Sequence, residues 1–244
     1  MEIKIVKQIL EWNEDVSSGI QDELRQKNVF LMNVMGSPGA GKTSLIRQLI
    51  AALRDRYSIA VIEGDIAGQI DADAIKALGI PVVQLQTDGA CHIEALSIQH
   101  ILPMFELDSI DLMIVENIGN LVCPAEFNIG EDLRVSILSV PEGDDKIEKY
   151  PLMFSTTDAL VINKSDVRPY FDFDEVRAKR DQENANPHAP VFSVSCRTGE
   201  GVSDFIEWLA DRIDGKLSAA SGEGMRGSGS EEKNAAKATE GVKK

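Results

Sequence analysis

The segment GSPGAGKT at residues 36–43 constrains the fold of this chain more than any other feature. It fits the pattern G-x-x-x-x-G-K-[ST] of a phosphate-binding loop. The apolar run VFLMNVM precedes it, and SLIRQLIAAL, which has helical periodicity, follows it. In such a loop the glycines let backbone N–H groups approach phosphates, and the following helix adds its positive end. The sequence therefore predicts a strand, a phosphate cradle and a helix in succession.

Each polar group of this loop has an expected part in nucleotide binding. The Lys42 ammonium is expected to neutralise the β- and γ-phosphates, which makes it a catalytic residue. The Thr43 hydroxyl is expected to ligate Mg²⁺. The alternative, a glycine-rich turn with an incidental lysine, does not explain the flanking strand and helix patterns. The residues predicted to contact the nucleotide here are Gly36, Ser37, Gly39, Ala40, Gly41, Lys42, Thr43 and Ser44.

Short apolar runs alternate with helical stretches along the rest of the chain. Runs that are rich in Val and Ile and apolar on both faces are typical of buried parallel strands. Strands are predicted at 29–35, 58–63, 81–85, 112–116, 134–140, 159–163 and 191–195, and helices at 43–55, 68–78, 91–102, 174–184 and 202–213. This alternation predicts a P-loop NTPase fold of the α/β class. Its sheet is expected to be doubly wound and mostly parallel, with about seven strands and helices on both faces.

Composition divides the chain into three parts. Residues 1–27 have apolar residues at helical spacing, which predicts an N-terminal helix. Residues 28–217 form the predicted P-loop GTPase domain with its metal site. Residues 218–244 contain almost no large apolar side chain, so a disordered tail is expected there.

Two later loops predict that the base is guanine. NKSD follows the apolar run ALVIN, and the Asp166 carboxylate can accept hydrogen bonds from the ring N–H and exocyclic amine of guanine. Adenine lacks that pair of donors, so such a site would reject it. The Asn163 amide is expected to meet the remaining polar edge, and the Lys164 stem to cover a face of the base. The loop SCRTGEG is expected to complete the base site through Ser195, Cys196 and Arg197.

Two predicted strands end in carboxylates that suit Mg²⁺. VIEGD places Asp65 at one strand end, and LMIVE places Glu116 at another. P-loop enzymes need a carboxylate near Mg²⁺ or its waters, so both are predicted to join Thr43 in the magnesium site and to act in catalysis. Solvated strand ends are the alternative. No convincing glutamine or arginine finger is present in the sequence, so hydrolysis is expected to be slow unless a partner or dimer completes the site.

Three further side chains form a candidate site for a softer metal. Cys91 and His92 are adjacent in TDGACHIEA, and Cys123 follows Glu116 in ENIGNLVCP. Two thiolates and an imidazole suit Ni²⁺, Zn²⁺ or Cu, and not Mg²⁺. The pair is expected in the first turn of the helix predicted over 91–102, where the helix N-terminus would favour the thiolate. A buried cysteine beside a hydrogen-bonded histidine is the commoner arrangement. The place of Cys123, in a loop that a γ-phosphate would reorder, favours the metal site.

Charge and composition exclude several kinds of partner. A formal net charge of −15 opposes nucleic-acid binding, because phosphate backbones require a basic surface. No run of about 18 apolar residues occurs, so no membrane-spanning helix is predicted. The three cysteines, an odd and low count, are typical of a reducing compartment. A cytoplasmic protein without nucleic-acid or membrane partners is expected.

In order and context, the motifs GSPGAGKT, VIEGD, TDGACHIEA, ENIGNLVCP, VPEGDDKIEKYP and NKSD closely resemble HypB, the GTPase family that helps insert nickel into [NiFe] hydrogenase. The resemblance extends over residues 28–216. It implies the dimerising SIMIBI branch of P-loop NTPases, with GTP or GDP, Mg²⁺, and Ni²⁺ or Zn²⁺ as ligands. It further implies that GTP favours a homodimer with a nickel or zinc site, made by Cys91, His92 and Cys123, at or near its interface.

The resemblance also implies two protein partners, a HypA-like nickel carrier and the hydrogenase large subunit precursor. Many relatives carry an N-terminal cysteine motif or a histidine-rich stretch, and this sequence shows neither, so only the switch-linked site is expected. Ser37 stands where some members of the branch have a second lysine. Alternatives are a urease-type nickel GTPase or a cobalamin-enzyme chaperone, a signalling GTPase with a structural Cys-His pair, and an enzyme with a thiol nucleophile.

Overall fold

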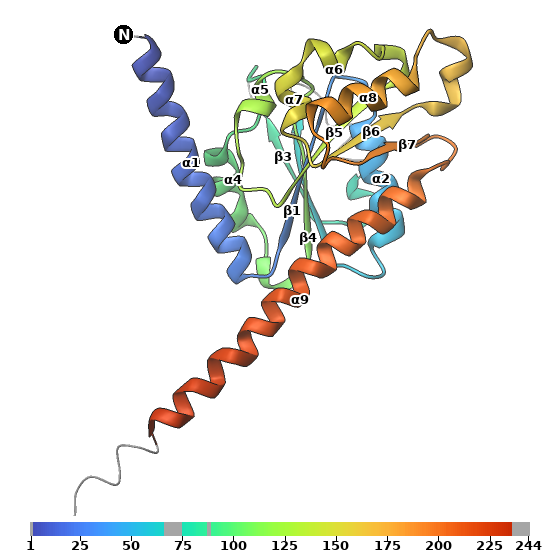
Figure 1. Ribbon diagram of the computed structural model, residues 1–244. Helices are drawn as coiled ribbons and strands as arrows, with labels where there is room; N and C mark the ends of the chain where they lie inside the picture. Colours follow the sequence, from blue (N-terminus) through green and yellow to red (C-terminus); the bar gives the residue numbers. More distant parts are fainter. Residues whose placement is uncertain (1, 66–74, 87–88, 236–244) are drawn as a thin grey trace, which may run out of the picture.

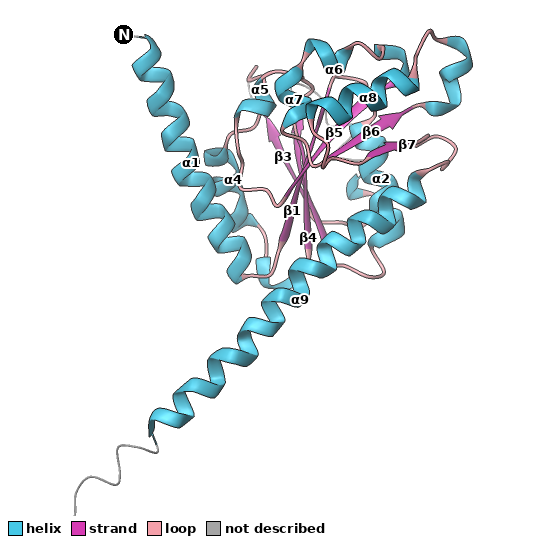
Figure 2. Cartoon of the chain, viewed as in Figure 1, coloured by secondary structure: helices cyan, strands magenta, loops and turns pink. Residues whose placement is uncertain are grey.

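The computed structural model describes residues 2–65, 75–86 and 89–235, and its centre is a seven-stranded sheet (Figures 1 and 2). The strands lie in the order β3-β2-β4-β1-β5-β6-β7, and every neighbouring pair is parallel. They are β1 Phe30–Gly36, β2 Ile59–Asp65, β3 Val82–Gln86, β4 Leu112–Glu116, β5 Leu133–Ser139, β6 Ala159–Asn163 and β7 Val191–Ser193. The predicted fold class and all seven predicted strands are confirmed, with small differences at the strand ends.

Helices cover both faces of the sheet (Figure 1). The α-helices are α1 Glu2–Gln26, α2 Lys42–Leu53, α4 Ala95–Ile101, α5 Cys123–Glu126, α6 Lys146–Lys149, α7 Pro151–Ser155, α8 Glu175–Ala185 and α9 Val202–Ala235. Short 3₁₀ helices are η1 Leu102–Met104, η2 Leu107–Ser109, η3 Val140–Glu142 and η4 Ser165–Tyr170. Most of the helix predicted over 68–78 lies outside the described residues.

The strand β1 shows why the strands of this sheet have apolar sequences. Its residues alternate between two cores: Met32 and Val34 pack under α2 and α9, and Leu31 packs under α1 and α4. All three side chains are fully buried. A strand covered on both faces must be apolar at successive positions, which is the pattern that predicted it. A third core, under α7 and α8, completes the second face.

The helix α9 continues beyond the sheet and projects away from it (Figure 1). It therefore runs through residues 218–235, where composition predicted a disordered tail. The composition argument concerned burial against a core, whereas the backbone hydrogen bonds of an α-helix close within one segment. Residues 236–244 of the predicted tail lie outside the described residues.

Tyr57, in the connection between α2 and β2, is bonded to α9 through its hydroxyl. Its side chain is 5% exposed, and its hydroxyl donates to Asp214 Oδ1 at 2.7 Å. Burial, followed by the bond to Asp214, raises the pKa of Tyr57 from 10.0 to about 12. The folded state thus binds the phenolic proton more tightly than the unfolded chain does. The stabilisation is complete below pH 10 and is lost as the pH rises through about 12.

We expect Tyr57→Phe to lower the free energy of unfolding by about 1 kcal/mol at pH 8, because one buried hydrogen bond is removed. The variant should also lose less stability than the parent between pH 10 and 12. Urea unfolding at each pH measures both effects. Equal stability of parent and variant at pH 8 would show that the hydroxyl does not anchor the helix.

Candidate functional site

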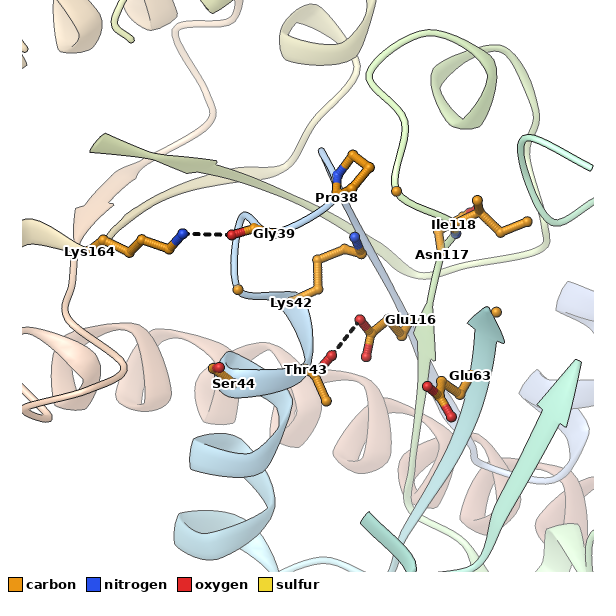
Figure 3. Close-up of a pocket in the computed structure, with 13 residues that line it drawn as sticks. Pro38, Gly39, Lys42, Thr43, Ser44, Glu63, Glu116, Asn117, Ile118 and Lys164 are labelled. Atoms are coloured by element: carbon orange, nitrogen blue, oxygen red, sulfur yellow. Dashed lines mark hydrogen bonds between the residues drawn. The ribbon is translucent and has the colours of Figure 1, made fainter. Parts of the chain in front are cut away.

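The phosphate loop leaves the carboxyl end of β1, in the middle of the sheet. Parallel α/β sheets bind ligands at this edge, where connections run to opposite faces. Gly41 has φ +102°, and an added Cβ would lie 2.2 Å from Asn163 Nδ2, so the site requires glycine. The loop and the ends of β2 and β4 enclose a cavity of about 440 Å³ (Figure 3). Of the predicted phosphate-binding residues, those that line it are Gly39, Gly41, Lys42, Thr43 and Ser44.

Three of the groups expected to act on the phosphates line this cavity. Lys42 is only 7% exposed, and its ammonium donates to the carbonyl oxygens of Gly36 and Ser37, each at 3.3 Å. The Thr43 hydroxyl donates to Glu116 Oε1 at 2.8 Å (Figure 3). A hydroxyl and a carboxylate are the hard oxygen ligands that Mg²⁺ prefers, so this pair fits the ion.

A second buried carboxylate lines the same cavity and was not among the predicted site residues. Glu63 is 2% exposed and lies in register with Glu116 on the neighbouring strand. The prediction selected Asp65, two positions further along β2, whose side chain lies outside the described residues. The sequence VIEGD contains both acids. Positions 63 and 65 share one face of the strand, so the sequence alone does not distinguish the two acids.

The base-binding loops meet the phosphate loop through one buried side chain. Asn163 Nδ2 donates to the Ala40 carbonyl at 3.0 Å. Its Oδ1 accepts from the backbone N–H groups of Lys164 at 2.7 Å and Cys196 at 3.1 Å. Lys164, in the left-handed region at φ 62°, also reaches back to the Gly39 carbonyl at 2.7 Å (Figure 3). The side chain of Asn163 therefore holds three loops together, and its predicted contact with guanine stays a prediction.

The predicted base-reading carboxylate is held in place by the last loop. Ser195, fully buried, donates its hydroxyl to Asp166 Oδ1 at 2.7 Å. Burial, and then the nearby Asp166 charge, raises the pKa of Cys196 to about 11. This thiol therefore stays protonated at neutral pH, which makes it a poor nucleophile and a poor metal ligand. Arg197 is exposed at the edge of the loop.

The three predicted soft ligands are brought together. One ligand atom from each of Cys91, His92 and Cys123 lies within 4.8 Å of the others. Cys91 Sγ is 3.4 Å from His92 Nδ1. The imidazole is 11% exposed and stacks on Phe127, with 4.1 Å between ring centroids. Packing of this kind fixes the orientation of the ring while leaving Cys91 exposed to solvent. The cluster can hold one metal ion with room for a further ligand.

The protonation of this cluster favours a ligand role for the histidine. Burial lowers the pKa of His92, against the opposing effect of Glu94 and Glu126, so the imidazole is neutral and can donate its lone pair. The hydrogen bond with Cys91, and then burial, raises the pKa of Cys123. A metal ion that binds there must displace the thiol proton, so binding is coupled to proton release.

The predicted start of the helix at residue 91 is wrong, because α4 begins at Ala95. Cys91 and His92 precede it in an irregular segment, so they do not lie in the first turn of the helix. The first N–H of α4 is satisfied from another element: Asn13 of α1 accepts from the Ala95 N–H at 3.1 Å. Asn13 also donates to the Asn128 carbonyl at 2.7 Å. The N-terminal helix is thus bonded to the segment that follows His92 and to the segment that follows Cys123.

A buried asparagine that the sequence did not single out joins the two halves of the site. Asn117 is 1% exposed and directly follows Glu116. Its Oδ1 accepts from the N–H groups of Ile93 at 3.1 Å and Ile118 at 2.9 Å, and its Nδ2 donates to Asn33 Oδ1 at 3.2 Å. The residue after His92 is therefore tied to the residue after Glu116. Among the described helices, none is long and apolar enough to cross a membrane.

Comparisons with known proteins show the family of this chain. The nucleotide-binding domain model of CobW/HypB/UreG proteins matches residues 30–193. The hydrogenase maturation factor HypB of Azotobacter vinelandii is 39% identical over 219 residues, which cover 89% of this chain and 72% of that protein. The hydrogenase/urease maturation factor HypB of Helicobacter pylori is 36% identical over 215 residues, covering 86% of this chain and 88% of that protein.

Solved structures show the same similarity. The crystal structure of HypB from Helicobacter pylori in complex with nickel has a TM-score of 0.79 and 34% identity, and the alignment covers 84% of this chain and 96% of that one. The crystal structure of HypB from Archaeoglobus fulgidus also has a TM-score of 0.79, with 33% identity and coverage of 83% and 99%.

Proposed function

Since this chain belongs to the CobW/HypB/UreG family, and within it to HypB, we propose that it is a GTP-hydrolysing nickel carrier that assists nickel insertion into [NiFe] hydrogenase. Nickel is its cargo, held by Cys91, His92 and Cys123. Two thiols and an imidazole also accept Zn²⁺, so zinc competes for this site. The nucleotide state decides how tightly the cargo is held.

The proposed hydrolysis depends on groups of the cavity. Lys42 neutralises the γ-phosphate, Thr43 and Glu116 hold Mg²⁺, and Asp166 reads guanine. Bound Mg²⁺ would supply neutralisation of the charge that develops on the phosphate oxygens. The part of the chain that the structure describes shows no glutamine or arginine placed beside the cavity lining to orient the attacking water. We propose that hydrolysis by the isolated chain is slow and that a GTP-favoured homodimer completes the site.

One observation carries the coupling between nucleotide and metal. The segment that leaves β4 begins at Glu116, which accepts from the phosphate-loop Thr43, and ends at Cys123, which belongs to the metal cluster. A change at the γ-phosphate acts on the first residue of this segment, and its last side chain is a metal ligand. We propose that GTP stabilises the assembled cluster and that loss of the γ-phosphate loosens it.

We expect nickel affinity to be at least about 5-fold higher with a non-hydrolysable GTP analogue than with GDP, the lower end of typical coupling between sites. Isothermal titration of the purified protein in each nucleotide state measures this ratio, and light scattering on the same samples reports the dimer. Equal affinities in the two states would exclude a nucleotide-controlled metal site.

The HypA-like nickel carrier and the hydrogenase large subunit precursor are the proposed protein partners. The nickel carrier is proposed from the resemblance to HypB alone. The hydrogenase is supported by the names of the relatives, one of which is called a hydrogenase/urease maturation factor. Delivery to urease is therefore the second candidate function. A pull-down from extracts with nickel-loaded protein, compared between GTP analogue and GDP, distinguishes the two recipients.

A further inference from the structure

Asn120 is the point at which the phosphate loop and both thiol-bearing segments meet. Its backbone N–H donates to the carbonyl of Gly36, the first residue of the phosphate loop, at 3.1 Å. Its side-chain Nδ2 donates to the Cys91 carbonyl at 3.3 Å. Its Oδ1 accepts from the N–H of Val122, the residue before Cys123, at 2.8 Å. One residue thus bonds to three separate parts of the site.

The neighbouring glycine places this residue against the phosphate loop. A Cβ on Gly119 would lie 2.7 Å from Pro38 Cγ, and 2.8 and 2.9 Å from the Pro38 backbone N and Cα. The two backbones therefore touch, with no side chain between them. Gly119 lines the cavity, whereas Asn120 does not. A displacement of the phosphate loop must move Gly119, and Asn120 moves with it.

The side chain of Asn120 bonds to the Cys91 carbonyl and the Val122 N–H, and it also forms a hydrogen bond with the Cys123 thiol. The Nδ2 bond fixes the backbone of Cys91, and the Oδ1 bond closes the turn that presents Cys123. Both thiols therefore depend on one carboxamide for their separation. This arrangement suits a positioning residue and not a fourth ligand.

We propose that Asn120 is the positioning residue that transmits the state of the phosphate loop to the spacing of the two thiols. The inference rests on the proposed function, since it names how the nucleotide controls the nickel site. Without the carboxamide, the metal site still has its three ligands, but its geometry no longer follows the phosphate loop. Nickel affinity then becomes nearly independent of the nucleotide.

Asn120→Ala is the direct test, and Asn186→Ala is a matched control. Asn186 makes the same two kinds of bond far from the metal cluster: Oδ1 accepts from His188 N–H at 3.0 Å, and Nδ2 donates to the Thr157 carbonyl at 2.8 Å. Asn120→Asp is a second variant, because it keeps the acceptor for Val122 and removes the donor to Cys91. Circular dichroism establishes that each variant is folded.

Nickel affinity is measured for each protein with GDP and with the non-hydrolysable GTP analogue, and the thiolate-to-nickel absorption band is recorded in both states. The parent and Asn186→Ala should bind nickel at least about 5-fold more tightly with the analogue than with GDP, and their absorption band should change with nucleotide. Both Asn120 variants should show a ratio within about 2-fold of unity and one band in both states.

Several outcomes would overturn the proposal. A folded Asn120→Asp with the full parental ratio excludes transmission through the donor to Cys91. Equal weakening in both nucleotide states, with the ratio retained, or loss of nickel binding altogether, leaves Asn120 a structural part of the site only. If the parent protein binds nickel equally well with GDP and with the GTP analogue, the proposed coupling itself is refuted. This failure differs from that of a variant that keeps the parental difference in affinity.

Discussion

Replacing Lys42 with alanine is expected to lower the rate constant of GTP hydrolysis by about 10²–10³-fold, the usual cost of removing one preorganised group that stabilises transition-state charge. The ammonium is buried among the phosphate-loop carbonyls, at 3.3 Å from those of Gly36 and Ser37. A water molecule that takes the place of the ammonium in the variant would not supply its positive charge. GTP affinity should fall as well, because the same charge faces the phosphates in the ground state.

Single-turnover hydrolysis at saturating GTP separates the two effects of Lys42→Ala. Lys179→Ala is the control, since Lys179 lies on the surface of α8 and pairs with Glu175 at 2.7 Å. The control should hydrolyse GTP within about twofold of the parent, as expected for an exposed ion pair. A Lys42→Ala rate that equals the control rate would show that hydrolysis, if present, takes place without the phosphate-loop lysine.

Replacing Cys91 with alanine is expected to weaken nickel binding by more than about 100-fold, because loss of an outer partner of a metal ligand already costs about 10–100-fold. Cys91 is the exposed member of the cluster and lies 3.4 Å from His92 Nδ1, so its loss leaves two of three ligands. Titration against a competing chelator of known affinity measures the change for nickel and for zinc.

Cys196→Ala is the control for nickel binding, since the Cys196 thiol belongs to the base-binding loop and its pKa is raised to about 11. Nickel affinity of this variant should equal that of the parent. If Cys91→Ala bound nickel as tightly as the parent, the cluster would not be the nickel site. The Cys91–His92 pair would then have no part in metal binding.

The fold was predictable from the sequence because its determinants are local. Strands β1, β4 and β6 are buried along their whole length, so their apolar runs are nearly continuous, and the phosphate loop is defined by glycines and a lysine at fixed spacing. The residue types Cys and His singled out the three predicted soft ligands in the sequence, and the structure brings these side chains together. The resemblance to HypB, which rests on several such motifs in order, is confirmed by the comparisons.

The connections between these motifs were not predictable, because they depend on side chains that meet across the fold. Asn13 satisfies the start of α4 from a helix 82 positions away, so a local capping pattern could not place that start. Asn117 and Asn120 appear in the sequence as two ordinary asparagines within ENIGN. Their roles become visible only when Ile93 and Cys91 are found beside them.

The central claim, that GTP hydrolysis releases the nickel ion, is tested most directly by timing release against hydrolysis. Nickel-loaded protein with bound GTP is mixed with a chromogenic chelator, and released nickel and phosphate are followed in a single turnover. The account predicts that the two rate constants coincide and that a non-hydrolysable analogue slows release by at least about 5-fold. Nickel release at the same rate with GTP and with the analogue would contradict it.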